Sequence, residues 1–268
     1  MNMKSRPWLG WVAVLLALLS GCSTLVPAPA VPAPTPQAAH AAWARVLATH
    51  VNELGEVDFQ ALARDRGDLD RFIRHVSEVS LDGLPDGPIR LAHMINAYNA
   101  LSMYNVLQSG IPATHAGWGK LRFFVLRKLD IGGRALSLYG FENDIIRPYT
   151  RAQNDPRVHF ALNCSAVSCP VLPRVPFSAE TLDADLERET RVFFAQPQNF
   201  RVDVAHRTLW LSELLNFYPE DFVPRPASSL LAYANRYAPQ PAPLDFTVRF
   251  TPYDWTIADS RRPKLARP

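Results

Sequence analysis

Apolar residues recur every three or four positions in several stretches of the chain, a pattern that predicts amphipathic helices. The predicted helices cover residues 40–49, 68–79 and 91–108, and two more begin after Ser137 and Ser178. The stretch 91–108 has the strongest pattern, and Asn96, Asn99 and Asn105 lie inside it. Asparagine is a poor helix former, so three in one helix indicate that some of them make specific hydrogen bonds.

Other stretches have the character of strands. Residues 123–131 and 134–138 flank a Gly132-Gly133 turn, and residues 200–204 and 208–211 form a second pair, so each pair predicts a β-hairpin. Residues 157–163 alternate between apolar and polar positions, which predicts a strand. Helices and hairpins follow one another without a strand-helix-strand rhythm. The pattern therefore predicts an α+β fold, a mainly helical single domain with a small antiparallel sheet of hairpins.

The N-terminus has the layout of a secretory signal. Lys4 and Arg6 precede an apolar run over residues 11–19, which is too short to span a bilayer. The run ends in Leu19-Ser20-Gly21-Cys22, which resembles the lipobox of bacterial lipoproteins. We expect residues 1–21 to be a signal peptide and Cys22 to carry the lipid, palmitate included; the alternative is an ordinary cleaved signal with a chance cysteine.

The residue after Cys22 bears on localisation. Ser23 in that position resembles lipoproteins that are passed on to the outer membrane, so we expect a chain that is lipid-anchored there and faces the periplasm. Residues 22–39 are rich in proline and alanine and carry no charge, which predicts an extended tether that holds the domain off the membrane. Residues 40–259 then form one globular domain, and residues 260–268 a basic tail.

Composition and charge narrow the class of protein. Of the 268 residues, 48% are hydrophobic, which is enough for a folded core and excludes general disorder. The formal net charge is +3, and removal of Lys4 and Arg6 with the signal leaves +1. A chain so close to neutrality lacks the excess of positive charge that is typical of proteins that bind nucleic acid.

The remaining two cysteines, Cys164 and Cys169, stand in the segment 155–170 together with His159. The segment reads Asp-Pro-Arg-Val-His-Phe-Ala-Leu-Asn-Cys-Ser-Ala-Val-Ser-Cys-Pro. With the four further motifs Met94-Ile-Asn-Ala-Tyr-Asn99, Ser137-Leu-x-x-x-Glu142, Leu211-Ser-x-x-x-x-Phe217-Tyr and Tyr253-Asp-Trp255, it resembles the family catalogued as domain of unknown function 547. The resemblance runs from about residue 40 to 259. The chain departs from that family at Asn143, where histidine is expected, and at Ala258, where asparagine is expected.

The family has no established activity, although some relatives join the domain to a glutaredoxin, which hints at thiol chemistry. A thiol enzyme would use Cys164 as nucleophile and His159 as base, with Asn96, Asn99 or Glu142 orienting the imidazole. Strand alternation, however, points His159 away from the side of Cys164. Pro170 also limits any helix that starts at Cys164, so a sustained helix dipole is not available to lower its pKa.

The other hypothesis is a structural disulfide between Cys164 and Cys169. The periplasm is oxidising, these two are the unlipidated thiols of the mature chain, and a non-helical spacer of four residues can bring the two Cα atoms within bonding range. A labile redox pair is a third interpretation. Oxidised cysteines cannot ligate a metal and the spacing supplies no fourth ligand, so no metal and no cofactor is expected.

A polar pocket is also predicted, in which His159, Asn96 and Glu142 converge near the cysteines and Asn99 and Arg157 contribute. Three buried polar side chains must satisfy one another or a ligand. Each also has a simpler structural interpretation, in which Asn96 and Asn99 tie their helix to a loop and Glu142 pairs with Arg147 or Arg157.

Two classes of function remain. The leading one is a non-catalytic binding or envelope-maintenance module with a polar pocket and a structural disulfide, and its partner is a small molecule or a protein. The alternative is a thiol-dependent enzyme that uses Cys164 and His159, either an amide or acyl hydrolase or transferase, or a thiol-exchange protein. In both classes the lipid anchor makes the membrane a partner.

Overall fold

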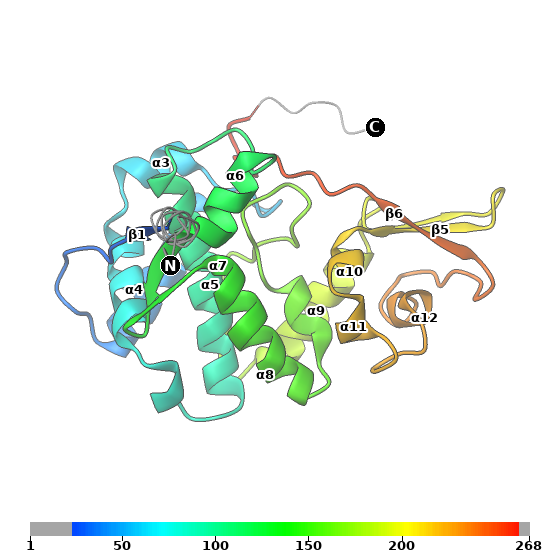
Figure 1. Cartoon of the computed structure of the whole chain (residues 1–268), viewed down its shortest axis with the longest axis horizontal. Coiled ribbons are helices and arrows are strands. Elements are labelled where there is room, and N and C mark those ends of the chain that lie inside the picture. The colour runs from blue at the N-terminus through cyan, green and yellow to red at the C-terminus, as the bar shows by residue number, and fades with distance from the viewer. Residues whose placement is uncertain (1–22, 263–268) are drawn as a thin grey trace, which may run out of the picture.

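The computed structural model describes residues 23–262. The predicted signal peptide, Cys22 and the last six residues of the predicted tail lie outside this range. The described chain is mainly helical and carries two small sheets of three strands each, which confirms the α+β class (Figure 1). Within residues 23–262, no helix is long and apolar enough to cross a membrane.

The first part of the chain packs around one long helix. This is α5 (Pro88–Gln108), which is buried from Met94 to Val106. Helix α2 (Pro36–His50) lies against α4 (Gly67–Glu78), and Trp43 of α2 stacks on Phe72 of α4 at 5.3 Å between ring centres. The short helices α3 (Phe59–Arg64) and η1 (Leu81–Gly83) complete this body. The helices predicted from the periodicity of residues 40–49, 68–79 and 91–108 are therefore present.

The first hairpin acquires an unexpected third strand. Strands β2 (Arg127–Ile131) and β3 (Arg134–Leu136) pair antiparallel around Gly132 and Gly133, which both have positive φ angles. Strand β1 (Thr24–Val26) pairs with β2 in parallel, so the sheet is mixed. Val26 is buried and the Tyr104 hydroxyl donates to the Pro27 carbonyl at 3.0 Å. The segment 22–39 was predicted to be an extended tether. Its residues 24–27 instead pack against the domain.

Two predicted strand segments are helical instead. Residues 123–126 belong to the π-helical η2 (Arg122–Leu126), which continues α6 (Trp118–Leu121) and turns Phe123 into the core. Residues 157–160 belong to the 3₁₀ helix η4 (Pro156–Phe160). There the Asp155 carboxylate accepts the Arg157 N–H at 3.1 Å, and proline at the first helical position is already set to a helical φ. The prediction of a strand over residues 157–163 is therefore wrong.

Between these segments runs an almost continuous helix of three parts, α7 (Leu138–Gly140), the π-helical η3 (Phe141–Ile146) and α8 (Arg147–Ala152). Ser137 begins it as predicted, because its side chain accepts the Gly140 N–H at 3.0 Å. The π turn contains Glu142, and π turns inside helices are frequent at functional sites.

The C-terminal part lies to one side of the helical body (Figure 1). Helix α9 (Leu182–Phe194) packs on η4, and β4 (Phe200–Asp203) and β5 (Thr208–Ser212) form the second predicted hairpin. Strand β6 (Thr247–Thr251) joins β5 in parallel. The short helices α10 (Leu214–Phe217), α11 (Pro219–Phe222) and α12 (Leu230–Ala234) surround an aromatic core. Residues 253–259 then return to the helical body.

Candidate functional site

The two cysteines lie at the ends of a short loop, residues 164–169, which we call the cysteine loop. Cys164 and Cys169 are free thiols, and their Sγ atoms are 2.7 Å apart. The Cys169 Sγ also accepts the Cys164 N–H at 3.1 Å and the Tyr253 hydroxyl at 3.2 Å. The structure thus brings the two sulfurs together as predicted, but it does not contain the predicted disulfide.

The C-terminal segment 253–259 covers the cysteine loop like a strap. Backbone hydrogen bonds hold the two together: Val167 N–H donates to the Thr256 carbonyl at 2.8 Å, and Ala258 N–H donates to the Ser165 carbonyl at 2.8 Å. Both cysteines are buried as a result. The His115 ring approaches the Cys164 carbonyl oxygen at 3.0 Å through Nε2.

The surroundings of the two thiols shift their pKa values in opposite directions. Burial raises the pKa of the Cys169 thiol, but its contacts with Cys164 and with the Tyr253 hydroxyl lower the pKa below its ordinary value. The hydrogen bond with Cys169, together with burial, raises the pKa of the Cys164 thiol. Cys169 is therefore the sulfur that ionises first, whereas the thiol-enzyme hypothesis uses Cys164 as the nucleophile.

His159 faces a carboxylate instead of a cysteine. Its Nε2 lies 2.8 Å from Oδ2 of Asp221, and its ring stacks on Tyr218 at 4.7 Å between centres. An ionised carboxylate can only accept, so Nε2 carries the proton in this contact. The imidazole is held between a buried acid and an aromatic ring, an arrangement that fixes its position.

Asp221 is the centre of a buried ion cluster. Arg147 donates from Nε at 2.7 Å and Arg151 donates from Nε at 2.7 Å, while Arg147 also binds Glu220 at 2.6 Å. Burial alone would raise the pKa of the Asp221 carboxyl, but hydrogen bonds from His159, Arg147 and Arg151 hold that pKa well below its usual range. The Arg147 guanidinium also lies over the Tyr218 ring, 4.2 Å from its centre.

Two tyrosines lie near Glu142. The Tyr98 hydroxyl donates to its Oε2 at 2.8 Å, and burial together with the Glu142 carboxylate raises the pKa of the Tyr218 hydroxyl. Burial raises the pKa of Tyr98, and the neighbouring Glu142 and Cys164 add to this rise. Tyr218 therefore stacks on His159 and lies close to Glu142, so both predicted residues are near this one ring.

The two asparagines are engaged elsewhere. The Asn96 Oδ1 accepts the Trp43 Nε1–H and the Phe177 N–H, each at 3.1 Å, and its Nδ2 donates to the Phe177 carbonyl. Asn99 binds the backbone on both sides of Leu162, since it donates to the Ala161 carbonyl and accepts the Asn163 N–H. Their hydrogen bonds match the structural interpretation, in which each ties α5 to a loop. None of these bonds goes to His159, Glu142 or a cysteine.

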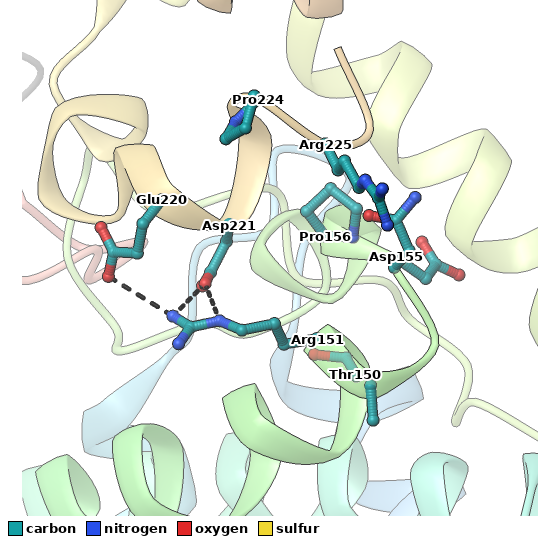
Figure 2. A pocket seen from close by; sticks show the side chains of 10 residues that line it. Thr150, Arg151, Asp155, Pro156, Glu220, Asp221, Pro224 and Arg225 are labelled. Atoms are coloured by element: carbon teal, nitrogen blue, oxygen red, sulfur yellow. Dashed lines mark hydrogen bonds and ion pairs between the residues drawn. The ribbon is translucent and has the colours of Figure 1, made fainter.

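A pocket of about 350 Å³ opens beside the ion cluster, between α8, η4 and α11. Figure 2 shows Arg151 reaching toward Glu220 and Asp221 on one side, with Asp155 and Arg225 on the other. Arg157, which was predicted to contribute to a pocket, does not line this one, but it pairs with the lining residue Asp155 at 2.8 Å. Arg225 makes no ion pair within residues 23–262. Most of the lining residues are polar or charged, and the pocket reaches the His159 network through Asp221.

Sequence reasoning missed four residues of this site. Tyr218 and Tyr253 stand in motifs that carried the family resemblance, so their positions were marked but not their roles. Tyr98 also stands in such a motif, and it has the spacing of an ordinary core residue as well. Asp221 follows Glu220 on a helix of four residues with no local signal. Within residues 23–262, no cluster of three or more His, Cys, Asp or Glu side chains could hold a metal ion.

Comparison with known proteins supports the resemblance over part of the chain. Residues 85–194 match the model of a family described as "Protein of unknown function, DUF547". The match includes Glu142, His159 and both cysteines, and it excludes Tyr218, Asp221 and Tyr253. No curated protein and no solved structure matches the chain.

Proposed function

We propose that the protein is an outer-membrane lipoprotein, anchored through Cys22, whose periplasmic domain is a non-catalytic binding module. The binding site in this proposal is the pocket beside Asp221. Its volume of about 350 Å³ suits a small molecule, and its walls combine the acids of the ion cluster with the unpaired cation of Arg225. The ligand class that fits is a small polar molecule with an anionic group.

One observation carries the non-catalytic assignment. The His159 Nε2 donates to the Asp221 carboxylate at 2.8 Å, and the ring is stacked against Tyr218. A general base for a cysteine must lie within hydrogen-bond reach of the sulfur. Neither cysteine sulfur has a histidine among its hydrogen-bond partners within residues 23–262.

The proposal includes a disulfide between Cys164 and Cys169. Closing it joins two sulfurs that already lie 2.7 Å apart. The two thiols lose two protons and two electrons to a partner disulfide of the periplasm, which is reduced to two thiols in the exchange. The bond would fasten the cysteine loop beneath the strap. The bond would reduce the conformational entropy of the unfolded chain. Because the loop is short, this would stabilise the folded state by only about 2 kcal/mol.

A second candidate, thiol exchange, is favoured by the contacts of Cys169. Its Sγ is approached by the Cys164 N–H, the Tyr253 hydroxyl and the Cys164 thiol, and these contacts stabilise a thiolate. In this case the Cys169 thiolate attacks a partner disulfide, and Cys164 then resolves the mixed disulfide. The strap over the loop restricts such an attack, which is why binding is the leading proposal.

Replacement of His159 separates a structural from a catalytic histidine. We expect His159→Ala to lower the Tm by several degrees, because it removes a hydrogen bond to a charged group worth about 2 kcal/mol and leaves a cavity under Tyr218. The matched control is His206→Ala, because His206 also bonds an aspartate but its side chain is 79% exposed. That variant should change the Tm by less than about 1 °C.

The two variants can be compared by differential scanning calorimetry at neutral pH. A His159→Ala protein that melts with the parent would count against the structural role. An activity that disappears while the Tm is unchanged would favour the thiol enzyme.

A further inference from the structure

An apolar stripe lies on the outer side of α6 and η2. Trp118, Leu121 and Val125 follow one another at helical spacing, so they share one face, and all three are exposed. Trp118 is 83% exposed, which is unusual for the largest apolar side chain. Exposed contiguous apolar side chains mark an interaction surface.

The start of the described chain lies beside this stripe. Thr24 pairs with Arg127, and Leu25 pairs with Lys128. Val125 is only two residues from Arg127, which limits its Cα distance to about 7 Å. Figure 1 shows β1 next to the segment that descends from α6. Leu25 is 59% exposed and adds an apolar side chain near the start of the described residues.

Cations border the same surface. Arg122, on η2, and Lys128, beside Leu25, form no ion pair within residues 23–262. Arg127 between them is buried, and its guanidinium donates to Asn105 and Ser109, so it does not belong to this border. The nearest acid along β2 is Asp130, and one of its carboxylate oxygens is buried. The border is therefore suited to anionic groups.

We propose that this surface rests on the phospholipid leaflet that holds the acyl chains of Cys22. We call it the anchor face and define it by Leu25, Trp118, Leu121 and Val125 with Arg122 and Lys128. The inference depends on the proposed lipid anchor. Cys22 is two residues from Thr24, and two residues span at most about 7 Å, so the anchor keeps this face at the bilayer.

The chemistry of the face matches the headgroup region. Tryptophan prefers the membrane interface, where its ring is partly apolar and its N–H can find a polar partner. Arg122 and Lys128 would pair with the phosphates of anionic lipids. The domain would then lie on the membrane in a fixed orientation and would not be suspended from it by a tether, as the composition of residues 22–39 suggested.

Tryptophan quenching tests the anchor face directly. Mature lipidated protein is reconstituted into vesicles of phosphatidylcholine and phosphatidylglycerol that carry brominated acyl chains, which quench tryptophans in contact with lipid. The parent should be quenched, and Trp118→Phe should lose most of that quenching. Trp210→Phe is the matched control, because Trp210 lies on β5 in the other sheet, and it should be quenched like the parent.

The outcomes distinguish this inference from the proposed anchor. Intact mass of the purified protein shows whether Cys22 carries the diacylglyceryl group, and Cys22→Ala should remain unprocessed or mislocalised in cells. A parent protein without the lipid would overturn both proposals. Lipidated protein in which Trp118→Phe is quenched as strongly as the parent would overturn the anchor face alone. The same holds if Trp118 is quenched by aqueous acrylamide and not by brominated lipid.

Discussion

Replacement of Asp221 by asparagine is expected to lower the free energy of unfolding by about 3–5 kcal/mol, the largest effect of any substitution proposed for this chain. The Asp221 side chain is only 4% exposed, and it receives hydrogen bonds from Arg147, Arg151 and His159. Asparagine keeps the shape but removes the negative charge. The buried Arg147 then loses its buried counter-ion and keeps only the more exposed Glu220.

The matched control is Asp245→Asn. Asp245 also pairs with an arginine, Arg207, but its side chain is 65% exposed. Exposed ion pairs contribute less than about 1 kcal/mol, so this variant should unfold almost like the parent. Urea denaturation at neutral pH measures both. Equal midpoints for the two variants would mean that the ion cluster does not hold the site together.

Mild acid is expected to destabilise the domain between about pH 6.5 and pH 4. Burial lowers the pKa of His115 to about 4, although its hydrogen bond with the Cys164 carbonyl acts in the opposite direction. Burial, with a contribution from His75, also lowers the pKa of His93 to about 4. Both histidines are neutral in the folded chain at a pH where they are protonated in the unfolded chain.

The sign of the pH effect follows from proton uptake. Between the two pKa values the unfolded state binds more protons, so acid favours unfolding. Stability is complete above about pH 6.5 and falls as the pH drops toward 4, and His115 alone accounts for up to about 3 kcal/mol of the loss. Urea midpoints of the parent and of His115→Gln across this range provide the measurement. The variant should show a clearly flatter slope, and identical slopes would contradict the assignment.

The parts of the fold that could be predicted are those with a long local pattern. Helix α5 and the hairpins at Gly132 and at residues 200–211 are specified by periodicity and turn residues. The 3₁₀ helix η4 was misread because alternation over seven residues outweighed Asp155 and Pro156, which begin a helix there. Strand β1 has three residues in a proline-rich stretch, too few for any period to show.

The candidate site could be predicted only at residues whose type alone indicates reactivity, such as cysteine and histidine. The approach of Cys164 to Cys169 could be expected because both cysteines stand in one short segment. Asp221, the partner of His159, lies 62 residues away in the sequence, on a short helix that only the tertiary fold brings close. Asn96 was placed in the pocket because it stands in a segment that carries the family resemblance, but its amide is used by Trp43 and the Phe177 backbone.

The most direct test of the proposed function is the count of free thiols in protein isolated from the periplasm without reductant. After rapid alkylation under denaturing conditions, mass spectrometry should find Cys164 and Cys169 unmodified and the chain two hydrogens lighter than the reduced form. Both should become alkylated after reduction. Two alkylated cysteines in the unreduced protein would contradict the disulfide, and with it the non-catalytic module, in favour of a site that keeps its thiols for chemistry.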